Sequence, residues 1–261
     1  MAVKEQSREM KPNFLPDTIP NEDEFVPATD ISFVIHPSTW EFIREQLDAG
    51  GRVLDVGCGN GTFLWNVEHR TSSRGYGLDI SPSRTKMAAT TIRSGRIVKA
   101  DGARAPFPAK CFDVIACMQL IEHIVDRQGF IAGLYEMLKP GGLLVITSVR
   151  RANLRWYYLR NEQGEIVLDR GHVYEFRSLD EFNELIVSGS AAERFSIIRT
   201  FEHQIRFPVA DFVFRRLHRL FRTSFTREFP ASRLGIALRK ATRVPIPGYF
   251  STDVVAMRRD S

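Results

Sequence analysis

A glycine-rich turn directly after a short apolar strand is the feature that most limits what this chain can fold into. Residues 53–56 form an apolar run broken by one acid, Asp55, and glycines follow at alternate positions 57, 59 and 61. From Thr62 onward, apolar side chains recur at helical spacing. A buried strand, a turn almost without side chains and a helix whose N–H groups face back to the turn favour a ligand with a polar or negative group.

Segments with strand and helix patterns alternate along the rest of the chain. Short apolar runs predict further strands at 75–80, 96–100, 112–117, 143–149, about 195–201 and 250–257. Helical spacing predicts helices that begin near residues 37, 62, 83, 127 and 178, the last with Ser178 and Glu181 as a capping box. We therefore expect an α/β fold, a Rossmann-like doubly wound seven-stranded sheet, mostly parallel with an antiparallel last strand and helices on both faces.

Composition points to a single domain. With 261 residues, 43% of them hydrophobic, the chain can bury a full core. We expect a mobile arm at 1–30 and one domain at 31–261, with insertions at about 150–177, a hairpin, and at 202–248. The polar start and the absence of a long apolar run favour a cytoplasmic protein. The three cysteines form no C-x-x-C pair, so neither a disulfide framework nor a metal site is expected.

The net charge of +5 is concentrated in the C-terminal part of the chain. Between residues 206 and 243 there are ten Lys or Arg against two acids, Asp211 and Glu228. Within 208–222, apolar residues recur on one helical face and arginines surround it, which predicts a basic amphipathic helix. The favoured interpretation is a lid helix packed on the sheet. The alternatives are a membrane-surface element and an arginine pocket for a phosphorylated or carboxylated ligand.

Four motifs in order along residues 52–149 carry a family resemblance. They are Leu-Asp-Val-Gly-Cys-Gly-Asn-Gly at 54–61, Gly-Leu-Asp-Ile-Ser at 77–81, Phe-Asp-Val-Ile at 112–115 and Leu-Lys-Pro-Gly-Gly at 138–142. The glycine spacing is G-x-G-x-G and not the G-x-G-x-x-G of dinucleotide-binding loops. In this combination the chain resembles the class I S-adenosylmethionine-dependent methyltransferases, closely the small-molecule branch that includes the ubiquinone-biosynthesis-like enzymes.

The resemblance implies S-adenosylmethionine as the cofactor, S-adenosylhomocysteine as its product and in-line displacement at the sulfonium methyl. It places the glycine turn against the methionine part, Asp79 on the ribose hydroxyls, Ile80 on the adenine face and Asp101 at the adenine amino group. The residues expected at the cofactor are Asp55, Gly57, Cys58, Gly59, Gly61, Asp79, Ile80, Asp101, Gly102, Ala103 and Gln119.

Three residues are candidates for a catalytic base. His123 follows the fourth strand, and its ordinary pKa near about 6.5 suits proton transfer. A structural histidine that caps the following loop is the alternative. His172 and Tyr174, which lead from the inserted hairpin back to the sheet, are second candidates, with hairpin packing as their alternative.

The sequence therefore predicts methyl transfer to oxygen or carbon of a small or lipid-like metabolite, with peripheral membrane contact through 208–222 as one interpretation. The segment 118–121 is not the Asn/Asp-Pro-Pro-aromatic motif of enzymes that methylate base amines, which disfavours base-amine methylation but not all RNA methylation. Nucleic acid is the less favoured partner. An RNA methyltransferase that uses the basic C-terminal half remains one alternative. A non-catalytic cofactor-binding subunit is the other, and the oligomeric state is not set by the sequence.

Overall fold

We describe the protein in a computed structural model over residue 31 and residues 34–92, 96–153, 159–161, 164–169, 171–187, 195–223, 225, 229 and 232–259, without the side chains of residues 212, 215 and 219. The predicted arm at 1–30 lies outside the described residues, as do residues 156–158 of the predicted hairpin.

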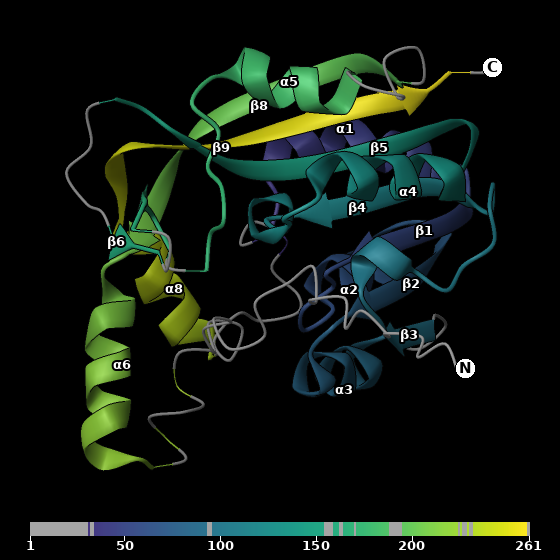
Figure 1. Ribbon diagram of the computed structural model, residues 1–261. Coiled ribbons are helices and arrows are strands. Elements are labelled where there is room, and N and C mark those ends of the chain that lie inside the picture. Colours follow the sequence, from purple (N-terminus) through teal and green to yellow (C-terminus); the bar gives the residue numbers. More distant parts are fainter. Residues whose placement is uncertain are drawn as a thin grey trace, which may run out of the picture.

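One seven-stranded sheet organises the molecule, in the order β3-β2-β1-β4-β5-β9-β8 (Figure 1). Its strands are β1 (Gly51–Val56), β2 (Ser73–Asp79), β3 (Arg96–Lys99), β4 (Phe112–Met118), β5 (Leu138–Arg151), β8 (Phe195–Pro208) and β9 (Arg243–Arg258). The strands from β3 to β5 are parallel, and β9 runs antiparallel between β5 and β8. The predicted fold class is confirmed.

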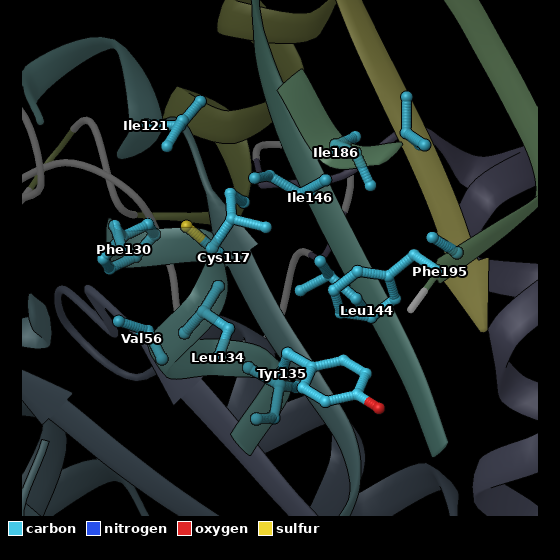
Figure 2. Packing of buried hydrophobic residues seen from close by; sticks show 14 of the residues in the cluster. Val56, Cys117, Ile121, Phe130, Leu134, Tyr135, Leu144, Ile146, Ile186 and Phe195 are labelled. Atoms are coloured by element: carbon cyan, nitrogen blue, oxygen red, sulfur yellow. The ribbon is translucent and has the colours of Figure 1, made fainter. Parts of the chain in front are cut away.

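Helices cover both faces of the sheet and divide the core into two clusters. One buried cluster draws on α1 (Pro37–Asp48), α2 (Thr62–Arg70) and α3 (Pro82–Thr91). The other packs α4 (Arg127–Met137) and α5 (Leu179–Val187) on the opposite face. Figure 2 shows part of this second cluster, where side chains such as Val56, Leu134 and Phe195 meet from β1, α4 and β8. Because helices cover both faces of the sheet, its central strands need apolar side chains on both faces, and the short apolar runs in the sequence provide them.

The predicted hairpin and capping box are present in the described residues. Strands β6 (Leu159–Arg160) and β7 (Ile166–Val167) pair antiparallel. At the start of α5, the Ser178 hydroxyl accepts the Glu181 N–H at 3.1 Å. The Glu181 carboxylate accepts the N–H of Arg177, one residue earlier than in a standard capping box. The cap is therefore displaced by one residue on that side.

The second insertion is shorter than predicted, because β8 and β9 stay paired beyond the end of the sheet. Opposite Tyr249, strand β5 ends at Arg151, whereas β8 and β9 pair on as far as Pro208 and Arg243. The insertion therefore spans 209–242, not 202–248. It contains α6 (Ala210–Phe221) and α8 (Arg233–Ala241), and we call residues 209–242 the distal lobe (Figure 1).

The predicted amphipathic helix is present as α6, but its predicted packing on the sheet is wrong. Val213 is 54% exposed, Leu217 40% and Leu220 66%, so the apolar face meets solvent. The reason is positional, since the lobe projects from a two-stranded ribbon and α6 has no sheet surface beneath it. No described helix is long and apolar enough to cross a bilayer.

Candidate functional site

The glycine turn lies where β1 ends, at the carboxyl edge of the parallel strands. Gly57, Gly59 and Gly61 have φ values of 79°, 52° and 84°, in the left-handed region that favours glycine. A Cβ on Gly57 would come 3.0 Å from a Leu120 methyl group. Conformation and close contact therefore both restrict side chains at the turn.

The turn and the tip of β2 are held together by hydrogen bonds. The Leu78 carbonyl accepts the N–H groups of Gly57 and Cys58 at 2.8 and 3.0 Å. The Asp79 carboxylate accepts the Gly59 N–H at 3.0 Å and the Ser81 N–H at 2.8 Å. Since both carboxylate oxygens keep further acceptor capacity, Asp79 positions the turn and still offers acceptors to a ligand.

The helix N-terminus behind the turn is partly used by the chain itself. The Thr62 N–H, expected to face the turn, donates to the Asn60 side-chain oxygen at 3.1 Å. Cys58 presents its backbone at the turn and buries its thiol, whose sulfur would lie 2.9 Å from a Cβ on Gly77. Burial, with the charges of Asp55 and Asp79, holds the pKa of the Cys58 thiol well above its usual range. The thiol is therefore not a nucleophile.

Asp55 lies buried beneath the turn. Burial and then the charge of Asp79 raise its pKa to about 8. At neutral pH its carboxyl is mostly protonated, so it contributes an O–H donor beneath the turn in place of a second negative charge.

Asp101 marks the tip of β3 and caps the short helix η3 (Gly102–Arg104). Its carboxylate accepts the Ala103 N–H at 3.0 Å. A Cβ on Gly102 would come within 2.9 Å of a Val56 methyl, so packing requires glycine there. Ile80 and Ala103 are partly buried against the core cluster of α4 and α5.

These residues together fit an adenosine ligand that carries an amino-acid end. Asp79 and Asp101 stand at neighbouring strand tips, where acceptor oxygens suit hydroxyl and amino donors. The turn beside them presents backbone without side chains, because glycine stands at positions 57, 59 and 61.

A second set of polar residues follows β4, in the short helix η4 (Ile121–His123). Glu122 is fully buried, and one of its oxygens accepts the Ser148 hydroxyl at 3.0 Å. His123 Nδ1 donates to the Gly171 carbonyl at 2.8 Å, and its ring lies 5.0 Å from that of His172. The structure thus brings two of the predicted catalytic candidates together.

The surroundings shift the pKa values of His123 and His172 in opposite directions. Burial is the main cause that lowers the pKa of His123. Burial also acts to lower the pKa of His172, but the hydrogen bond to Glu175 and the carboxylates of Glu122 and Asp169 outweigh it and raise that pKa. The lowered pKa favours the neutral, proton-accepting form of His123, whereas the raised pKa favours the charged form of His172.

Glu122, His123 and His172 also form a group that has the donor chemistry of a metal site. One potential ligand atom from each lies within 4.8 Å of the others. Within the described part of the chain, Glu122 Oε1 is buried and accepts no hydrogen bond. The expectation of no metal stays a prediction. Residues 122 and 172 are far apart in the sequence, and only the fold brings them together.

Tyr174, the third catalytic candidate, contacts Glu181 and Arg127. Its hydroxyl donates to the Glu181 carboxylate at the start of α5, and the Arg127 guanidinium lies 4.3 Å from its ring centre. Burial and this hydrogen bond raise the pKa of Tyr174. These contacts fasten the segment after the hairpin to α5, as the packing alternative for this residue requires.

The sequence analysis named Gln119 but missed the polar cluster in which it lies, on the α1 side of β4, β5, β9 and β8. We define this cluster as His36, Gln119, His203 and Ser251. Gln119 donates to the Thr147 hydroxyl at 3.1 Å and to that of Ser251 at 3.3 Å. His203 pairs with Ser251 across the strands, and its ring lies 4.3 Å from that of His36. Only the order of strands in the sheet unites these positions, so no local spacing signals them.

Comparison with known proteins identifies relatives of the central part of the chain. Residues 54–146 match the family model described as a methyltransferase domain. The ubiquinone biosynthesis O-methyltransferase of Pseudomonas entomophila (strain L48) is 31% identical over 154 residues, covering 56% of this chain and 63% of the relative. That of Xanthomonas euvesicatoria is 32% identical over 124 residues, covering 45% and 51%. The chain thus spans about half to two thirds of the length of these curated relatives.

Solved structures share the fold. An S-adenosylmethionine-dependent methyltransferase from Mesorhizobium loti matches with a TM-score of 0.54 at 19% identity, covering 86% of this chain and 99% of that one. Geranyl diphosphate C-methyltransferase from Streptomyces coelicolor A3(2) matches with a TM-score of 0.53 at 15% identity, covering 85% and 79%. At these identities the likeness concerns architecture.

Proposed function

We propose that this protein, whose residues 54–146 match a methyltransferase-domain family model, transfers a methyl group from S-adenosylmethionine to oxygen or carbon of a small or lipid-like metabolite. The observation that carries the proposal is the hydrogen bond between the glycine turn and Asp79, the acid proposed to bind the ribose, inside the part of the chain that matches the family model.

The chain's own residues have defined tasks in this proposal. When bound, the cofactor supplies a methyl group on a positively charged sulfur, which is already activated for displacement. Gly57, Gly59 and Gly61 admit the methionine end of the cofactor, Asp79 accepts its ribose hydroxyls, and Asp101 accepts its adenine amino group. Alignment of the reacting atoms then provides most of the rate.

An oxygen acceptor also has to lose a proton, and two histidines are candidates to take it. His123 has a lowered pKa, caused mainly by burial, and its Nδ1–H is directed at Gly171, which makes Nε2 the basic nitrogen. The pKa of His203 is also lowered, first by burial, and its buried Nδ1 has no hydrogen-bond partner in the described part of the chain. The names of the relatives favour oxygen over carbon as the methylated atom.

Cofactor binding is the first test. Titration calorimetry of wild type with S-adenosylmethionine should show binding, and Asp79→Ala should weaken it by about a hundredfold, since charge-assisted hydrogen bonds are worth about 1.5–3 kcal/mol each. Asp126→Ala is the matched control, because Asp126 caps α4 through the Gly129 N–H and serves no predicted ligand role. Absence of binding to wild type at millimolar ligand would reject the proposal.

A screen of phenolic and lipid-like acceptors, read as S-adenosylhomocysteine released, then tests turnover. His123→Ala and His203→Ala should separate the two base candidates. The variant that removes the base loses turnover and the rising limb of the pH profile but keeps cofactor affinity. If turnover is unchanged in both variants, neither histidine is the base. Stable hetero-association without any turnover would instead favour the non-catalytic subunit.

A further inference from the structure

Large apolar side chains are exposed over the distal lobe. On α6, Val213, Leu217 and Leu220 follow one another at intervals of four and three residues, and on α8, Leu234 and Leu238 are four residues apart. These spacings place each set on one side of its helix. All five side chains are at least 40% exposed. Each helix therefore presents an apolar stripe to solvent.

The lobe is held together without these stripes. The Asp211 carboxylate on α6 accepts a hydrogen bond from Arg239 Nε on α8 at 2.7 Å, and both side chains are buried. Phe214, also buried, lies 5.5 Å from the Phe229 ring. Because other faces join the two helices, the stripes are surplus to the fold of the lobe and available for a partner.

The charge around the stripes is positive. Arg216 and Arg222 on or beside α6, and Arg233 and Lys240 on α8, are exposed. Of the two acids between residues 206 and 243, Asp211 is taken up by its buried pair with Arg239. A partner that complements both properties has negative groups at its surface and hydrocarbon directly beneath them, as an anionic phospholipid bilayer has. An RNA would match the charge but would leave the leucines in water.

The lobe also lies at the edge of the sheet where the ligand residues gather. Strands β8 and β9 run past the carboxyl end of β5, and the glycine turn and Gln119 lie at the carboxyl ends of β1 and β4. In Figure 1 the lobe extends from this side of the sheet. A surface that docks at α6 and α8 is therefore on the same side of the molecule as the site.

We propose that the exposed stripes of α6 and α8 dock the protein on an anionic phospholipid membrane, and that the methyl acceptor is an amphiphile whose apolar tail lies in that membrane. The acceptor part of this inference rests on the proposed methyltransferase function. The docking part does not, because it is measured without cofactor or turnover.

Vesicle co-sedimentation of the full chain tests the docking. Wild type should bind phosphatidylcholine vesicles that contain phosphatidylglycerol, bind pure phosphatidylcholine weakly, and release as salt rises. Leu217→Glu/Leu220→Glu should lower the partition coefficient by about tenfold or more, because two apolar side chains are lost from the interface. Arg216→Glu/Arg233→Glu should weaken binding to anionic vesicles and reduce its dependence on salt. Met87→Glu, at an exposed apolar position on α3, should bind like wild type.

The outcomes separate the alternatives. No binding of wild type to anionic vesicles, or equal binding by wild type and the double leucine variant, overturns the docking. Salt-dependent binding to RNA without vesicle binding assigns the basic surface to nucleic acid. A dimer that Leu217→Glu/Leu220→Glu abolishes, without vesicle binding, assigns the stripes to a second copy of the chain. Cofactor titration of the same variants shows whether the site is intact, so failure of docking and failure of the proposed function are distinguishable.

Discussion

The sheet region around β1, β2 and β4 and the distal lobe use apolar side chains in opposite ways. In the sheet region they are packed so closely that a Cβ on Gly77 would lie 2.7 Å from methyl groups of both Ile97 and Leu64. In the lobe, Leu220 and Phe221 are 66% and 63% exposed. The sheet region buries its apolar side chains within the fold, whereas the distal lobe leaves several of them exposed.

The difference separates the region that holds the ligand residues in place from the region that exposes apolar surface. The packed region fixes the positions of Asp79 and the glycine turn within narrow limits, as a ligand site requires. Among the described residues, the lobe is joined by a buried ion pair, an aromatic contact and hydrogen bonds to Thr242 between its two ends, and it leaves large apolar side chains exposed. Breaking each region should therefore have different, local consequences.

The largest effect is expected at the ion pair of the lobe. Arg239→Met leaves Asp211 buried without its partner, which typically costs about 3–5 kcal/mol. Hydrogen exchange should accelerate across 209–242 and stay unchanged across 54–146. Arg44→Met, which removes two exposed ion pairs on α1, should cost below about 1 kcal/mol for each. Faster exchange in both regions would mean that lobe and sheet unfold as one unit.

A matched pair of glycines should measure how tightly the sheet region is packed. Gly77→Ala forces its methyl against Ile97, Leu64 and the Cys58 sulfur, and should destabilise the protein by about 1–3 kcal/mol. Gly133→Ala on α4 meets nothing within 4 Å and should stabilise it by about 0.5–1 kcal/mol. Thermal unfolding of both variants gives the comparison. Similar shifts of Tm in the two would contradict the packing argument.

A third effect, spread over several pH units, is a pH dependence that originates under the glycine turn. Asp55 has a pKa near 8 in the folded protein, and an ordinary one, near about 4, when unfolded. The folded state therefore holds a proton that the unfolded state releases, so this contribution to stability is fully present below about pH 4 and is lost as pH rises toward 8. Asp55→Asn should flatten this slope, measured as Tm from about pH 5 to about pH 9. A parallel curve would place the carboxyl in its ordinary state.

Much of the fold follows from local patterns in the first 150 residues. There, short apolar runs end in Asp79 or in the turn at Gly57, and strands β1 to β4 pair parallel to their neighbours, so position in the sequence indicates the edge of the sheet. Because parallel strands end at the same edge of the sheet, the sequence also predicted that the cofactor residues gather at that edge. Their roles toward a ligand remain predictions.

Other features depend on pairing that local patterns do not reveal. Polar residues such as Glu202 and Gln204 hide the continuation of β8, although Ile205 and Phe207 alternate with them, and the solvated ribbon tolerates this mixture. The polar cluster of His36, Gln119, His203 and Ser251 exists only because β9 lies between β5 and β8. The amphipathic pattern of α6 predicted a helix correctly, but periodicity cannot say whether an apolar face is covered.

The join between sheet and lobe separates the strand register of the two regions. Between the pairs Gln204–Phe250 and Arg206–Pro245 the ladder is interrupted, and the interruption contains Pro247 and Gly248, the latter with φ of 84°. Register is therefore not transmitted across this point. A change in the length of the lobe can therefore be absorbed at residues 205 and 246–248 while the strand pairing of the sheet is preserved.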